Sequence, residues 1–231
     1  SDDDPGLASD ECGKPEAWYV IAREPGAGIY IGLTADADQA SLREAIEAGA
    51  DVSRFLPFVP VEPGDFFVIA AGTPHCIGAG VFVVEPQRVR PGKRGVTYRY
   101  WDWTRTYDSE GRRDPDGAPR ELHLERALAV TRWNLPRGEA LLADIRVRAG
   151  RPPRRARVEA LHDDGLRVSR VAGTGQVSLP SCETLAGLTV LEGSVRLGGL
   201  EVPCGRTAAL PPGWEPRRAI LASAHAILAS A

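Results

Sequence analysis

Methionine is missing from the whole sequence of 231 residues, so we expect the chain to be processed or to be a piece of a longer protein. Lysine is nearly missing too: Lys14 and Lys93 are the only two, and arginine carries the remaining positive charge of the side chains. The formal net charge is -3 at pH 7. A slightly acidic chain offers no electrostatic reason to bind nucleic acid, which selects basic surfaces.

Long hydrophobic runs and paired cysteines are also missing. The apolar run FFVIAAG at 66–72 is far shorter than the ~20 residues that cross a bilayer. The four cysteines form no CxxC pair, and no signal peptide is visible. The sequence therefore predicts a cytoplasmic protein with reduced thiols and without a membrane partner.

Glycine and proline are plentiful, with 25 and 19 residues, and are spread along the chain. Such a spread is typical of short strands joined by turns. We expect a helix at 38–49, ended by Gly49, and the strongest helix at 120–133. In the first half we expect strands in the following ranges, the first two as a hairpin: 16–22, 28–33, 60–72, 81–85 and 95–103.

The second half repeats the pattern of short strands. We expect them at 140–147, 166–171, 185–197 and 206–213, before an alanine-rich tail in which AILAS occurs at 219 and at 226. The chain thus has two β-rich halves with a helix between them, and the boundary lies near Trp133. Strands at this density favour closed barrels or double-sheet jelly rolls.

A histidine and a carboxylate suggest a metal site. His75 lies in AGTPHCIGAG, a glycine-flanked turn between two apolar strands, and Glu16 opens the strand EAWYVIA. A histidine held rigidly there is either a metal ligand or merely hydrogen-bonded, and the turn alone slightly favours the second interpretation. Glu16 must be exposed, paired or bound to a cation. Together they offer N and O ligands suited to zinc or iron, but two ligands do not complete a site.

Two cations add to this picture. On a strand, Thr97, Arg99 and Trp101 share one face, so a buried Arg99 needs an anion, which is either a ligand oxyanion or an acid such as Glu85. Lys14 lies two residues before Glu16 and shares its face, unless it is simply solvated. The remaining histidines are interpreted as structural or incidental: His123, His162 and His225.

Four blocks resemble one enzyme family in order and spacing. They are GKPEAWYVI, PGDFFVIAAGTPHCIGAG, TYRYWDW and RELHLERAL, and they resemble type I mannose-6-phosphate isomerase, a zinc-dependent family of cupin-type β-barrels. The resemblance implies a mainly β fold, with a metal-site cupin domain at 1–133, a C-terminal cupin domain without metal ligands at 134–231, and a few helices between the halves. It runs to about Val130 and is weaker beyond.

The resemblance also implies roles for particular residues. Glu16 and His75 match two of the family's four zinc ligands, and the other two, a glutamine and a histidine, are expected just upstream of Ser1. Arg99 matches the catalytic arginine that stabilises the transition state, and Lys14 matches a substrate-binding residue. One departure is Gly95, which stands where relatives have an aspartate.

The implied function is interconversion of mannose 6-phosphate and fructose 6-phosphate through an enediol, with one Zn²⁺ per chain. The expected partner is a small sugar phosphate, and the chain is expected to be a monomer. Two alternatives stay open. One is a non-catalytic cupin that binds a sugar phosphate, and the other is an iron-dependent cupin oxygenase.

Overall fold

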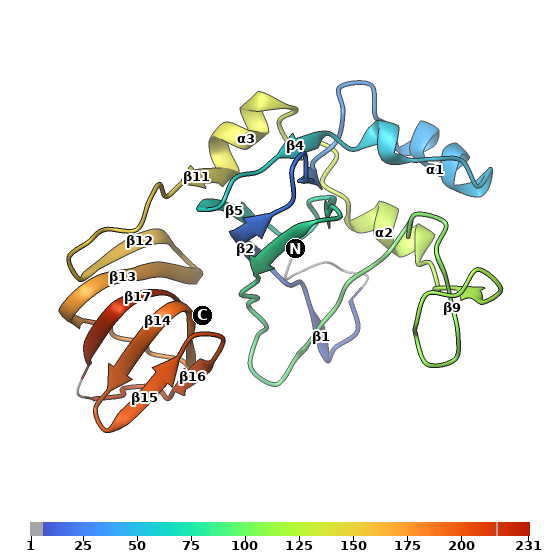
Figure 1. The fold of residues 1–231 in the computed structure, drawn as a ribbon. Coiled ribbons are helices and arrows are strands. Elements are labelled where there is room, and N and C mark those ends of the chain that lie inside the picture. The colour runs from blue at the N-terminus through green and yellow to red at the C-terminus, as the bar shows by residue number, and fades with distance from the viewer. Residues whose placement is uncertain (1–6, 216) are drawn as a thin grey trace.

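The computed structural model describes residues 7–215 and 217–231, which form two β-rich units joined by one short connection (Figure 1). The predicted mainly β class is confirmed. The helices are α1 (Gln39–Glu47), α2 (Leu124–Val130) and α3 (Glu139–Ile145). The strands of the first unit are β1 (Glu11–Cys12), β2 (Glu16–Arg23), β3 (Gly28–Ile31), β4 (Phe58–Pro60), β5 (Asp65–Ile69), β6 (His75–Ile77), β7 (Val81–Val84), β8 (Arg94–Gly95), β9 (Thr106–Tyr107), β10 (Ala118–Pro119) and β11 (Arg146–Arg148). Those of the second unit are β12 (Arg157–Asp164), β13 (Leu166–Ser178), β14 (Ala186–Leu197), β15 (Leu200–Pro203), β16 (Thr207–Leu210) and β17 (Arg218–Ser230).

The core of the first unit lies between two antiparallel sheets. One sheet has the strand order β11-β5-β2-β7 and the other β4-β3-β6. Trp18 and Val20 of β2 pack there with Ile29 of β3 and Phe67 of β5. Two sheets that share one apolar interior are what the predicted double-sheet jelly roll requires.

The predicted hairpin between 16–22 and 28–33 is wrong. β2 pairs with β5 and β7, whereas β3 pairs with β4 and β6 in the other sheet. Both strands carry apolar residues toward the same core, so they cover it from two sides instead of lying side by side. His75, expected in a turn, is likewise the first residue of β6 and pairs with Ile31 of β3.

The two predicted helices are present. Before α1, the Asp38 carboxylate accepts a hydrogen bond of 2.8 Å from the Ser41 backbone N–H, and Gly49 follows the helix with φ +66°. α2 is shorter than the predicted 120–133. It ends because Thr131 has extended backbone, and it begins late because the His123 N–H donates to the Arg99 carbonyl.

The predicted strand at 140–147 is wrong over most of its length, which forms α3. Leu141, Leu142 and Ile145 follow helical spacing, and the last two pack against the core of the first unit. β11 then pairs with β5. The division into 1–133 and 134–231 stays a prediction, and these contacts favour a boundary after Arg148.

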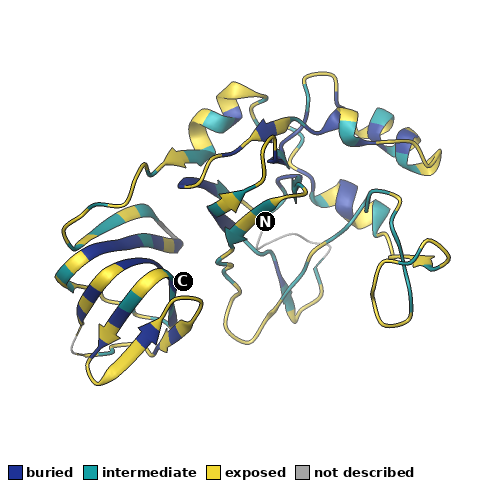
Figure 2. Ribbon diagram, viewed as in Figure 1, coloured by how far each residue is buried: buried dark blue, intermediate teal, exposed yellow. Residues whose placement is uncertain are grey.

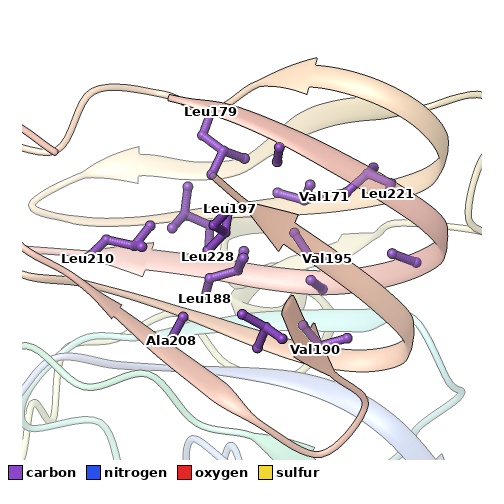
Figure 3. Packing of buried hydrophobic residues seen from close by; sticks show 14 of the residues in the cluster. Val171, Leu179, Leu188, Val190, Val195, Leu197, Ala208, Leu210, Leu221 and Leu228 are labelled. Atoms are coloured by element: carbon purple, nitrogen blue, oxygen red, sulfur yellow. The ribbon is translucent and has the colours of Figure 1, made fainter. Parts of the chain in front are cut away.

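The second unit is a curled sheet with the order β12-β13-β17-β14-β15, and β16 also pairs with β14. It encloses an apolar core (Figure 3), while exposed residues alternate along its outer surface (Figure 2). Both AILAS copies lie on β17 and put their first alanine and their leucine into this core. The two copies start at 219 and 226, an odd number of residues apart, so in a regular strand their equivalent side chains would point to opposite faces of the sheet. A bulge at Ser223, with φ +46°, adds one residue and brings the second copy back to the face that points into the core.

The two units meet along the outer face of β2. Ala17 and Tyr19 point away from the first core and pack with Val168 of β13 and Ile227 of β17. The Tyr19 hydroxyl lies 3.0 Å from Nε2 of His225, and both residues are buried. β2 is therefore covered on both faces, which fixes the strand that begins with Glu16.

Candidate functional site

A cavity of roughly 330 Å³ lies in the first unit. Its wall comes from the start of β2, the turn before β6, the segment 96–103 and one side of α2. The four site residues predicted from the sequence all line it, although they come from three separate stretches of the chain: Lys14, Glu16, His75 and Arg99.

Glu16 is the centre of a small charged cluster. It is only 5% exposed, and its carboxylate lies 2.9 Å from Lys14 Nζ and 3.5 Å from His75 Nε2. Burial raises the pKa of Glu16, but the contacts with His75, Glu85 and Lys14 outweigh burial and bring the pKa down to about 2. Glu16 is therefore a carboxylate at neutral pH. Of the interpretations of Glu16 left open by the sequence, the structure excludes the solvent-exposed one.

The hydrogen bonding of His75 leaves one ring nitrogen available. Nδ1 lies 2.7 Å from the Thr73 carbonyl, which can only accept, so Nδ1 carries the proton. In the neutral ring Nε2 then has a free lone pair, and this nitrogen faces Glu16. The Trp18 ring and the imidazole also pack in a T-shaped arrangement, with centroids 5.3 Å apart.

Glu16 and His75 fit two positions of a zinc shell, with one oxygen and one nitrogen directed toward each other. Among residues 7–215 and 217–231, no group of three or more His, Cys, Asp and Glu side chains is arranged to hold a metal ion. The described part of the chain thus supplies two suitable donors and no third.

Glu85 was missed as a neighbour of this cluster. Its carboxylate accepts a 2.9 Å hydrogen bond from Trp18 Nε1, and burial together with the nearby Glu16 carboxylate raises its pKa. The sequence offered Glu85 only as an ion-pair partner for Arg99. No such pair forms between these described residues, so that interpretation is wrong.

Arg99 has a partly buried side chain with no ion pair or hydrogen bond to any residue that the structure describes. Its backbone, in contrast, is held on both sides by His123. The Arg99 carbonyl accepts from the His123 N–H at 2.7 Å, and the Arg99 N–H donates to His123 Nδ1 at 3.4 Å. His123 was expected to be structural or incidental, and these contacts are structural, but no local signal in the sequence indicated that it anchors Arg99.

The predicted strand at 95–103 is wrong beyond its first residue. β8 ends at Gly95, and 96–103 is irregular chain along the cavity wall. Trp103 and Thr104 have positive φ values of 56° and 52°, which a strand cannot accommodate. A β-carbon added to Gly95 would lie 3.2 Å from Lys14 Cδ, so the glycine leaves the space that the lysine side chain occupies.

No helix of the described residues is both long and apolar enough to span a membrane. The four cysteines predicted to be reduced are all free thiols.

The two-sheet unit with a cavity in its wall defines a cupin-type β protein, and solved structures support this class. A mannose 6-phosphate isomerase of Bacillus subtilis superposes with a TM-score of 0.70 at 24% identity, over 96% of this chain and 66% of that one. A Salmonella typhimurium enzyme of the same name, bound to fructose 6-phosphate and zinc, gives a TM-score of 0.56 at 12% identity, over 94% of this chain and 66% of that one. At these identities the likeness shows the fold.

Sequence comparison names the relatives. The chain is 38% identical over 120 residues to the mannose-6-phosphate isomerase of Streptococcus mutans, and equally to one from Bacillus subtilis. Each match covers 52% of this chain and 34% of the relative, so the matched part spans about a third of the relatives' length. The resemblance to mannose-6-phosphate isomerases is confirmed. No family model matches the chain.

Proposed function

We propose that this chain carries the active-site cavity of a mannose-6-phosphate isomerase, which interconverts mannose 6-phosphate and fructose 6-phosphate. The observation that carries the proposal is the convergence of Lys14, Glu16, His75 and Arg99 on one cavity. The similarity to proteins of that name supports the choice of substrate.

The proposed cofactor is one zinc ion held by Glu16 and His75, with two further ligands from outside residues 1–231. When bound, it would supply Lewis-acid polarisation of the sugar oxygens. The Thr73 carbonyl supports this role, because it fixes the His75 tautomer in which Nε2 is unprotonated and has the lone pair that binds a metal. Lys14 compensates the buried Glu16 carboxylate while leaving Glu16 ionised, the form that binds a cation.

Arg99 is proposed as the catalytic cation. Moving a proton between C1 and C2 passes through an enediol, and negative charge develops on an oxygen of the substrate. A guanidinium that no described residue neutralises can stabilise that charge without first breaking an ion pair. His123 holds the backbone of Arg99 on both sides, so the point at which the side chain enters the cavity is set before substrate binds. Lys14 is proposed to contact a substrate oxygen from the same wall.

The proposal keeps the predicted cytoplasmic location, which the free cysteines support. The small-molecule partner is a sugar phosphate, and the monomeric state stays a prediction. A non-catalytic sugar-phosphate-binding cupin is the second candidate, favoured by the finding that the described residues offer no group of three metal-binding side chains.

The test is turnover of mannose 6-phosphate by the full-length gene product, assayed after chelation and again after zinc is restored. His75→Ala and Glu16→Gln are expected to lose both turnover and bound zinc. The matched control is His162→Ala, which removes a histidine of β12 outside the cavity and should retain both. A folded wild-type protein that binds zinc and fructose 6-phosphate without turnover would establish the non-catalytic binder instead.

A further inference from the structure

The stretch 98–104, of which residues 98–103 line the cavity, concentrates features that cost folding free energy. Two of the three non-glycine residues with positive φ in the described chain are Trp103 and Thr104. A bulky and a β-branched residue in succession rarely adopt this conformation. Two of the four buried side-chain polar atoms without a partner among the described residues, Tyr98 Oη and Trp101 Nε1, lie in the same short stretch. Such costs gather where a segment is shaped for binding.

The result of this backbone conformation is an aromatic cluster at the cavity. The rings of Trp101 and Trp103 lie with centroids 4.3 Å apart, and both residues line the cavity together with Arg99. Trp103 is fixed from two other sides. Its Nε1 lies 3.4 Å from Cys76 Sγ, and its ring lies 4.9 Å from that of Tyr30. The indoles are thus held in place before any ligand arrives.

We propose that Trp101 and Trp103 are specificity-determining residues that form an apolar platform for the carbon skeleton of the sugar. This inference rests on the proposed function and adds the part of the cavity that distinguishes a sugar phosphate from phosphate alone. A hexose phosphate has oxygens at C1 and C2, where charge develops, beside apolar C–H faces, and the wall offers a guanidinium with two indoles two and four residues further on. Aromatic surface with a few placed polar groups is the usual lining of small-molecule sites.

If the two indoles form this platform, replacing one should weaken only the ligand that has a sugar, whereas a general loss of structure would weaken every ligand. Trp101→Leu is expected to weaken binding of fructose 6-phosphate about tenfold, the typical effect of losing one well-packed apolar contact, and to leave the affinity for inorganic phosphate unchanged. Trp103→Leu should do the same. Trp101→Phe keeps an aromatic face and should retain most of the affinity. Arg99→Ala, in contrast, removes the cation proposed for the transition state and should lower turnover far more than it weakens binding of fructose 6-phosphate.

The experiment is calorimetric titration of the full-length protein with fructose 6-phosphate and, separately, with inorganic phosphate. Trp214→Leu is the matched control, because Trp214 packs on the core of the second unit and should affect neither ligand. Thermal unfolding of each variant checks that it folds. In turnover, Trp101→Leu should raise KM by the same factor and change kcat less than about twofold.

The outcomes separate this inference from the proposed function. If Trp101→Leu loses affinity equally for both ligands, or keeps its affinity for fructose 6-phosphate, the platform is overturned and the proposed isomerase function is unaffected. A folded wild type that binds phosphate but not fructose 6-phosphate would overturn the isomerase and the platform together.

Discussion

Replacing Arg99 with alanine should remove most of the catalytic activity without lowering the stability of the fold. The reason is that its guanidinium has no ion pair or hydrogen bond to the residues that the structure describes, so folding gains little from it. Its hydrogen bonds to the rest of the described chain run through the backbone, which His123 holds and which alanine keeps. We therefore expect the free energy of unfolding to change by less than ~0.5 kcal/mol.

The loss of activity can be estimated from Coulomb's law. A full charge placed ~4 Å from a developing oxyanion, at an effective dielectric constant of about 20, contributes about 4 kcal/mol. Because ~1.4 kcal/mol corresponds to a factor of ten, kcat/KM should fall about 1000-fold. Arg99→Lys keeps the charge but loses the planar fork, so its loss should be intermediate.

The assay measures kcat/KM by coupled turnover of mannose 6-phosphate and stability by urea unfolding, for both variants of Arg99. Arg196→Ala is the control, since Arg196 is exposed on β14 of the second unit and lies outside the cavity. If the kcat/KM of Arg99→Ala lies within tenfold of the wild-type value, the assignment of Arg99 as the catalytic cation is refuted. A large loss of stability would show instead that the arginine has a structural partner.

Three further predictions concern the residues that hold the site in place. Burial lowers the pKa of His225 below the ordinary 6.5, so its stabilising effect is complete above pH 6.5 and is lost as the pH falls through the lower folded pKa. His225→Gln should therefore reduce the fall in the free energy of unfolding below pH 6.5 and leave its slope above pH 6.5 unchanged, as measured by urea unfolding. Asp65→Asn leaves the largely buried Arg146 without its counter-charge and should lower the free energy of unfolding, measured in urea, by about 3 kcal/mol. Gly95→Ala should lower the free energy of unfolding by about 1 kcal/mol, because the added methyl group crowds its neighbours. Gly95→Asp should also draw the Lys14 ammonium away from Glu16, so its kcat/KM should be lower than that of Gly95→Ala.

Each of these has a result that contradicts it. A pH profile of the glutamine variant parallel to that of wild type would show that His225 does not titrate on unfolding. A cost below about 1 kcal/mol for Asp65→Asn would mean that water reaches the guanidinium. Equal kcat/KM in the alanine and aspartate variants of Gly95 would show that Lys14 has no part in the reaction.

Local pattern predicted the strands better than their partners. The runs at 16–22 and 81–85 are strands because each is apolar and bounded by turns. Their pairing could not be predicted, because β2 is apolar on both faces and therefore shows no alternation that marks an outer side. Its second face is covered by Val168 and Ile227, which follow far along the chain, and no window of local sequence connects them.

The sequence indicated four candidate residues that share one cavity, but not the residues that hold them there. Glu16 and His75 stood out as a carboxylate and a histidine against apolar neighbours, and Arg99 and Lys14 were proposed from the strand faces expected for them. The family resemblance then gave all four residues their roles. The residues that place them carry no such signal. The Thr73 carbonyl that sets the tautomer of His75 is ordinary backbone, and it becomes informative only when folding brings it to Nδ1.

The failure at 95–103 has a different cause, and it bears on function. TYRYWDW alternates as a strand should, and its aromatic and β-branched residues favour one. The chain instead turns through positive φ at Trp103 and Thr104, which turns a segment that could have paired in a sheet into the wall of the cavity. A conflict between local preference and final structure is expected where a segment is selected to bind. The mispredicted stretch is thus the one that carries both the proposed catalytic arginine and the proposed sugar platform.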